Sequence, residues 1–143
     1  MTINQALKQK NVLAGKLVVL KTRIYNSNRF IKGETPSYNA ATVLKEYQAT
    51  QEAMIELKTQ ISTASTPIIG VIIKLAELKL FIAQFKALQV NKGLEASRYN
   101  SGLPLEYDVS ITQLEKDELT DIYQQHILQF QEELDQFNAK TNI

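Results

Sequence analysis

Four residues in two predicted turns have the chemistry to bind a small anion. Arg98 and Tyr99 are adjacent in a predicted loop, and Lys92 lies earlier in the same loop. An arginine can form two parallel hydrogen bonds to a phosphate or carboxylate, and a tyrosine adds a ring and a hydroxyl. Because bases in loops can converge, we predict a ligand site at Lys92, Arg98 and Tyr99, with Arg29 of the first turn as a further member. The alternative is that these side chains hold the loop to its own domain.

No other group of residues predicts catalysis or metal binding. The single histidine, His126, has no second histidine as a partner, so we expect a packing or surface residue. Asp117 and Asp121 share a helix face and could hold Mg²⁺ through water. We expect them instead, with Glu118, to solvate the start of their helix or to face a basic helix. The chain has no cysteine and none of the common phosphate-loop, serine-nucleophile or zinc motifs. We therefore predict no catalytic residue, no metal and no cofactor.

The length and composition are those of one globular domain spanning residues 1–143. Of the 143 residues, 44% are hydrophobic and 22% charged, which is enough apolar material for a core without disulfides. No signal peptide is visible. The most apolar stretch, residues 67–90, is interrupted by four charged residues, so it does not predict a membrane span. We expect a soluble, cytoplasmic protein that does not bind membranes.

Helical periodicity dominates the sequence. Apolar residues recur at steps near 3.5 over residues 3–27, where Thr2 opens a capping box and Gly15 suggests a close packing contact. A second helix is predicted over 40–62, followed by a break in which Pro67 begins a third helix with Thr66 as its cap. The seam of the second helix alternates steps of three and four, as in a coiled coil: Ala40, Val43, Tyr47, Thr50, Met54, Leu57 and Ile61.

The third predicted helix, over residues 67–90, is apolar on more than one side. A helix of this kind must be covered on more than one side, so it lies either at the centre of a bundle or at a subunit interface. One stripe consists of Val71, Leu75, Leu78, Ile82 and Phe85, and the second consists of Ile69, Ile73, Ala76 and Leu80.

After a loop, residues 103–111 alternate between apolar and polar types, which predicts a short strand or extended arm. A lone strand is not stable in water, so we expect it to pair with residues 29–32 or with a partner chain. A second capping box then opens a last helix over 112–138. The predicted fold class is all-α: an antiparallel bundle of about four long helices, in two helical hairpins, with a short extended or β segment at 103–111.

Charge is distributed unevenly along the chain. Residues 1–100 sum to +14 − 6 = +8 and residues 101–143 to +2 − 9 = −7, although the net charge is only +1. Opposite charges at the two ends of a helical chain suggest that the ends meet, within one copy or between copies.

Several short motifs, taken together, resemble the septicolysin-like family of small helical proteins from bacteria and phages. The match follows the order of the elements and covers nearly the whole chain. The sequence departs from the family pattern in two ways: its segment at 103–111 is longer, and it lacks a C-terminal tryptophan. The resemblance implies a helical, oligomeric protein and carries no established mechanism. The residues that carry it are Gln5-Ala6-Leu7, Asn28, Gly33-Glu34 with Pro36, Leu44, Glu46, Leu78-Lys79, Arg98-Tyr99, Glu133-Leu134-Asp135 and Asn138.

Three functions are compatible with these features. The first is a non-enzymatic, self-associating interaction or scaffold protein whose partner is another copy of itself. The second is an oligomer that sequesters a small anionic ligand such as a nucleotide, as a phage inhibitor of host signalling would. The third is a nucleic-acid accessory protein, which the scattered bases of the first helix and the small number of arginines argue against.

Overall fold

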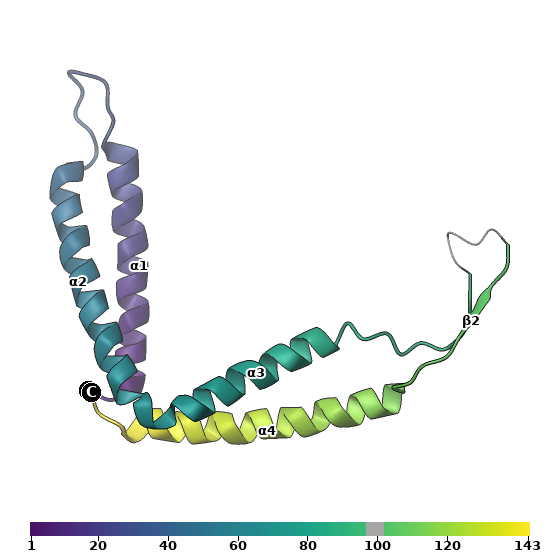
Figure 1. Cartoon of the computed structure of the whole chain (residues 1–143). Helices are drawn as coiled ribbons and strands as arrows, with labels where there is room; N and C mark the ends of the chain where they lie inside the picture. Colours follow the sequence, from purple (N-terminus) through teal and green to yellow (C-terminus); the bar gives the residue numbers. More distant parts are fainter. Residues whose placement is uncertain (97–101) are drawn as a thin grey trace. The chain divides into compact units, whose positions relative to one another are not determined.

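A computed structural model describes residues 1–96 and 102–143 of the chain and confirms the all-α fold class (Figure 1). Over the described residues there are four α-helices, one short 3₁₀ helix and two three-residue strands. Their bounds are α1 Ile3–Ser27, α2 Ala40–Ala64, η1 Thr66–Ile68, α3 Ile69–Phe85, β1 Gly93–Glu95, β2 Leu105–Tyr107 and α4 Gln113–Lys140.

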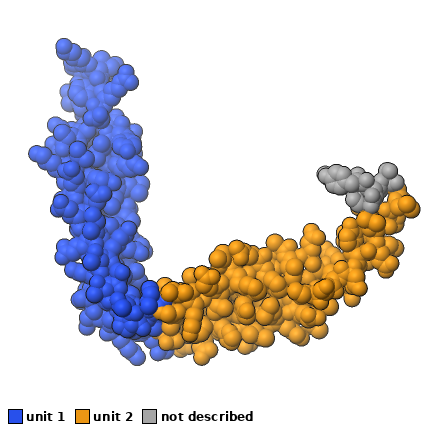
Figure 2. Space-filling model, viewed as in Figure 1, with its two compact units in different colours: residues 1–69, 135–143 blue, residues 70–134 orange. Residues whose placement is uncertain are grey.

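The described residues form two compact units, which Figure 2 shows in different colours. The first unit contains residues 1–69 and 135–143, and the second contains residues 70–134. The prediction that residues 1–143 form a single domain stays a prediction.

In the first unit, α1 and α2 pack along the seams that their periodicity predicted. From residue 40 to residue 63, the seven predicted seam positions of α2 are the ones that are buried or half-buried. Facing them, Leu20 of α1 is only 2% exposed. Buried Thr50, within the seam, donates its hydroxyl to the carbonyl oxygen of Glu46, which satisfies a polar group that would otherwise destabilise the core.

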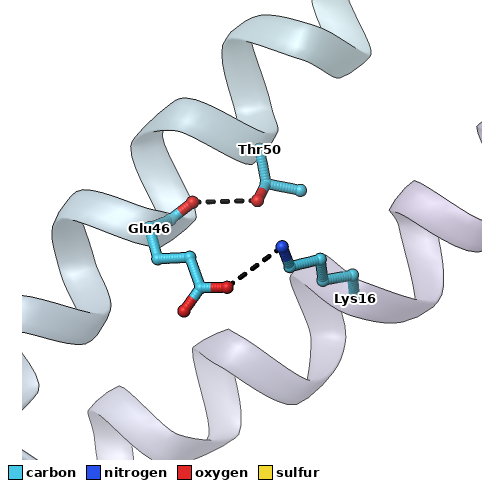
Figure 3. A network of polar contacts seen from close by, with 3 residues as sticks. All are labelled: Lys16, Glu46 and Thr50. Atoms are coloured by element: carbon cyan, nitrogen blue, oxygen red, sulfur yellow. Dashed lines mark hydrogen bonds and ion pairs between the residues drawn. The ribbon is translucent and has the colours of Figure 1, made fainter.

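An ion pair also joins the two helices. The Nζ atom of Lys16 lies 3.0 Å from Oε1 of Glu46, one turn before Thr50 on α2 (Figure 3). Both side chains are about half exposed, at 48% and 53%, so water screens the pair. We therefore expect it to contribute about 0–1 kcal/mol, far less than the apolar seam beside it.

The first and last residues of the sequence meet in the first unit. Thr2 and Asn142 form an antiparallel bridge, in which the Ile3 N–H donates to the Thr141 carbonyl at 2.9 Å and the Ile143 N–H donates to the Met1 carbonyl at 3.0 Å. Ile3 is only 1% exposed beside this bridge. The two ends thus meet within one copy through backbone hydrogen bonds, and the pairing of the basic and acidic segments stays a prediction.

In the second unit, aromatic side chains join α3 to α4 in antiparallel register. The ring centroids of Phe81 and Tyr123 lie 4.9 Å apart, and the Lys74 ammonium lies 5.2 Å from the Phe130 centroid. Leu75 and Ile82 of α3 are 4% and 6% exposed. This is the first of the two predicted apolar stripes, and it is the one that faces the interior of the unit.

Helix α3 ends at Phe85, five residues before the predicted end. Past Phe85 the backbone tightens, with the Leu88 N–H donating to the Phe85 carbonyl at 3.1 Å. The ammonium group of Lys116 on α4 then donates to the carbonyls of Lys86 at 3.0 Å and Leu88 at 2.9 Å. These bonds satisfy carbonyl groups that would have accepted backbone hydrogen bonds in a longer helix. The positive charge of Lys116 also interacts favourably with the negative, C-terminal end of the helix dipole.

The predicted extended segment contains β2, but its partner strand was predicted wrongly. Leu105–Tyr107 pairs antiparallel with Gly93–Glu95, with Gly93 opposite Tyr107 and Glu95 opposite Leu105. The partner is thus the segment that the sequence indicated as loop, rather than residues 29–32. Gly93 and Gly102 both have positive φ angles, which allows the chain to turn into and out of the hairpin.

Two local predictions were also wrong. A Cβ atom added at Gly15 would have no neighbour within 4 Å, so no close packing contact explains this glycine. Thr66 is not the cap of the helix at Pro67, because the 3₁₀ helix begins after Ser65 without a side-chain cap and the Thr66 hydroxyl donates back to the Ser62 carbonyl. The capping box at Thr2, by contrast, is confirmed on both sides of the reciprocal pair.

Candidate functional site

The predicted anion-binding residues lie in both units and partly outside the described chain. Arg29 is exposed in the turn that follows α1, in the first unit. Lys92 is exposed immediately before β1, in the second unit, where it lines a cleft of about 620 Å³ together with Glu106 and Asp108. Arg98 and Tyr99 lie outside the described residues. Convergence of the four therefore stays a prediction.

The surroundings of Lys92 bear on that prediction. Glu106 and Asp108 bring two carboxylates to the same cleft. Carboxylates repel an anionic ligand, so this cleft taken alone favours a cation or a mixed polar surface over a phosphate. Any selectivity for an anion would have to come from residues outside this cleft.

The acidic residues and the histidine of α4 lie at the surface. His126 is exposed, and its ring stacks on Tyr123 with a centroid distance of 6.5 Å. Asp117 accepts a hydrogen bond from the side chain of Gln113 at 2.9 Å. Within the part of the chain that the structure describes, no group of three or more His, Cys, Asp or Glu side chains is arranged to hold a metal ion.

A further cleft was not predicted from the sequence. It lies between the last turns of α1 and the loop that follows this helix, and its volume is about 710 Å³. We call it the tip cleft. Its walls are formed by Val18, Val19, Thr22, Arg23, Asn26, Ser27, Phe30, Ile31, Glu34, Thr35, Pro36, Ser37 and Tyr38.

The walls of the tip cleft combine apolar and polar side chains and remain open to water. Phe30, Ile31 and Val18 are 55%, 68% and 65% exposed, although each is a large apolar residue. Ligand pockets have similar volumes but enclose most of a small molecule. Side chains this exposed would leave a small ligand in contact with water, so the tip cleft has the character of a docking surface.

The walls of the tip cleft contain one basic and one acidic side chain, Arg23 and Glu34. The guanidinium carbon of Arg23 lies 4.7 Å from the centroid of the Tyr38 ring, an arrangement that is worth about 0.5–1 kcal/mol at an exposed site. This stacking holds Arg23 at the cleft. Because these two charges have opposite signs, the lining favours neither an acidic nor a basic partner.

A second apolar surface lies on α3. The predicted second stripe, which we call the outer stripe, is exposed along its length: Ile69 is 51%, Ile73 55% and Leu80 49% exposed. At about 100° per residue, the outer stripe lies on the side of α3 opposite to the buried Leu75 and Ile82. Its members are Ile69, Ile73, Ala76 and Leu80.

None of the helices in the described residues combines the length and the apolar content that a membrane-spanning helix requires.

No protein-family model matches this sequence, and comparison with curated proteins also gives no match. The fold is similar to that of a functionally unknown conserved protein from Corynebacterium diphtheriae, whose crystal structure aligns with a TM-score of 0.69. The alignment covers 96% of this chain and 95% of that chain at 15% sequence identity. At this identity the similarity supports the fold alone, and the resemblance to the septicolysin-like family stays a prediction.

Proposed function

We propose that this protein is a non-enzymatic, self-associating helical protein that acts as an interaction or scaffold module. The observation that carries the proposal is the exposed outer stripe of α3. Its large aliphatic residues, Ile69, Ile73 and Leu80, remain about half exposed in a single chain. Contiguous apolar surfaces on soluble proteins usually mark sites of association.

The charge of the helices supports another copy as the partner. Helix α1 carries five basic residues and no acidic residue, whereas α4 carries seven acidic and two basic residues. Two copies can therefore bring surfaces of opposite charge together around an apolar contact. Complementary charge favours specificity and speed of association more than affinity, so the apolar stripe supplies most of the expected stabilisation.

Light scattering of the full chain after size-exclusion chromatography tests this function. We expect a mass at micromolar concentration that corresponds to two or more chains of 16.2 kDa. Raising the salt concentration should change the rate of association more than the final mass, because salt screens exposed charges and leaves apolar contacts in place. A mass of one chain at every concentration up to about 100 µM, well above a micromolar dissociation constant, would refute the proposal.

The other two predicted functions stay predictions. A protein that sequesters a small anion would depend on Arg98 and Tyr99, which lie outside the described residues. Calorimetry with a panel of nucleotides on the wild type and on Arg98→Ala tests that function. Nucleic-acid binding is tested by the salt dependence of affinity, since each phosphate contact makes binding weaker as salt rises.

A further inference from the structure

The outer stripe of α3 has the spacing of a coiled-coil seam. It continues past Leu80 to Ala83, so that Ile73, Ala76, Leu80 and Ala83 follow one another at steps of three, four and three. We call these four residues the α3 seam. All four are exposed in the single chain. Steps of this kind keep apolar side chains in line along a helix, where a second helix covers them. The spacing therefore predicts a helix as the partner.

Among the long helices of the described residues, the exposed sides of α1, α2 and α4 match the α3 seam poorly. Each of them has a charged residue in line with its exposed apolar residues. On α4, Asp121 lies midway between Leu114 and Leu128, and Lys8 of α1 and Glu52 of α2 are exposed in the same way. Burying such a charge against an apolar seam without a partner group destabilises the contact. The helix that suits the α3 seam best is thus the α3 seam of a second copy.

The order of large and small residues makes the α3 seam complementary to itself. Ile73 and Ala83 lie at equal distances before and after residue 78, and so do Ala76 and Leu80. In a contact with twofold symmetry, residue i contacts residue j and j contacts i. If two α3 helices pack antiparallel about a twofold axis at residue 78, Ile73 faces Ala83 of the second copy and Leu80 faces Ala76. Every layer then combines one large and one small side chain, which lets the helices pack closely.

A parallel arrangement of the two helices would pack less well. Each seam residue would then face the same residue of the second copy. The large pairs at Ile73 and Leu80 would hold the helices apart and leave cavities at the alanine pairs. Because unfilled space in an apolar contact destabilises it, the sizes of the side chains favour the antiparallel arrangement.

Two charged residues border the α3 seam, and neither determines the orientation. The Lys79 ammonium donates to the side-chain oxygen of Gln131 on α4 at 3.2 Å, so it is already held by its own chain. Glu77 would lie near Glu77 of the second copy, but this residue is exposed and water screens such a pair. The packing of the apolar layers therefore decides how the helices align.

We propose that α3 of one copy packs antiparallel on α3 of a second copy, through the α3 seam and around a twofold axis at residue 78. The inference rests on the proposed self-association and names the surface and the orientation that produce it. Because both copies use the same surface, the contact closes a dimer and leaves no α3 seam open for a third copy.

Disulfide crosslinking tests the proposal, since the chain contains no cysteine and introduced thiols are the only ones present. Ala76→Cys and Leu80→Cys are prepared as separate full-length variants, mixed in equal amounts and oxidised by dissolved oxygen. The proposed dimer places these two positions opposite each other, and a disulfide requires Cβ atoms about 3.5–4.5 Å apart. In either variant alone the two thiols are displaced by four residues, about 6 Å along the helix. We therefore expect several-fold more crosslinked chain in the mixture than in either variant alone.

A second pair and a control make the measurement specific. Ile73→Cys mixed with Ala83→Cys should behave like the first pair, so a loss of packing at Leu80 cannot hide the contact. The matched control is Gln125→Cys, at an exposed position of α4, mixed with Leu80→Cys. It should crosslink no more than the single variants do. Circular dichroism checks that all variants keep the helical content of the wild type, as exposed positions allow.

The outcomes separate this inference from the proposed function. A wild type with the mass of one chain in light scattering overturns both. A wild type that assembles, together with two mixtures that crosslink no more than the control, overturns the α3 contact alone. Single variants that crosslink as strongly as their mixtures also overturn it, because that result indicates a parallel contact in which each residue faces its own counterpart.

Discussion

Replacing two residues of the outer stripe with glutamine should weaken self-association strongly while leaving the monomer folded. Ile73 and Leu80 are 55% and 49% exposed in the single chain. Full burial of such a side chain is worth about 1.5–3 kcal/mol, so about half of that, roughly 1 kcal/mol, is available to a contact between copies. In a contact where both copies use the outer stripe, four side chains contribute about 4 kcal/mol. This corresponds to roughly a thousandfold increase in the dissociation constant.

Sedimentation equilibrium over a range of concentrations measures this change. Glutamine forms helices well, so Ile73→Gln with Leu80→Gln should leave the helical content of the monomer nearly unchanged, which circular dichroism measures. The matched control is Glu77→Gln, an exposed polar position beside the stripe, which should associate like the wild type. A double variant that associates with an unchanged dissociation constant would refute the reasoning, because the outer stripe would then be exposed in the assembly as well.

Three further changes test the account of the fold. Gly15→Ala should raise the free energy of unfolding by about 0.5–1 kcal/mol, because the added methyl group contacts no other atom and alanine forms helices better than glycine. Chemical denaturation measures this change. A loss of stability would instead indicate a packing contact at Gly15. Lys116→Met keeps the aliphatic part of the side chain but removes both hydrogen bonds to the end of α3. Chemical denaturation should therefore show a loss of about 1–3 kcal/mol in the free energy of unfolding. An unchanged denaturation midpoint would contradict the capping role. His126→Gln should leave stability and assembly within about 0.5 kcal/mol of the wild type, as for other surface substitutions, whereas a stoichiometric metal lost with this change would overturn that view.

The helical seams could be predicted from the sequence because burial imposes a period on the residues themselves. In α2 the alternation of three and four residues marks the buried side from Ala40 to Ile61 without any knowledge of α1. The two apolar stripes of α3 were found in the same way. Which stripe faces α4 could not be read from the sequence, because both are equally apolar and the choice depends on the register of Phe81 against Tyr123.

The misassigned elements depend on contacts between distant residues. The backbone after α3 gives no signal of its own in the sequence, because the hydrogen bonds that satisfy its carbonyls come from Lys116, about 30 positions further along the chain. The apolar residues after Phe85 therefore predicted that the helix continues. Strand β1 has three residues and begins with a glycine, which is too short for an alternating pattern. Its pairing with β2 is a property of the hairpin and not of either segment alone.

The tip cleft was missed because its apolar residues are interspersed with turn residues. Phe30 and Ile31 are separated from Tyr38 by two charged residues and by glycine, threonine, proline and serine, a composition that predicts only a connection between helices. The signal that was present is their size, since a solvated turn has no need of two large aromatic rings. They become part of one surface only when the loop lies beside the end of α1, which local sequence does not encode.

The measurement that tests the central claim most directly is the mass of the full-length wild-type protein, by light scattering, over a hundredfold range of concentration in low and high salt. Self-association through the outer stripe predicts a mass of two or more chains of 16.2 kDa, reached at micromolar concentration and retained in high salt. A mass of a single chain across the whole range, in both salts, would contradict it.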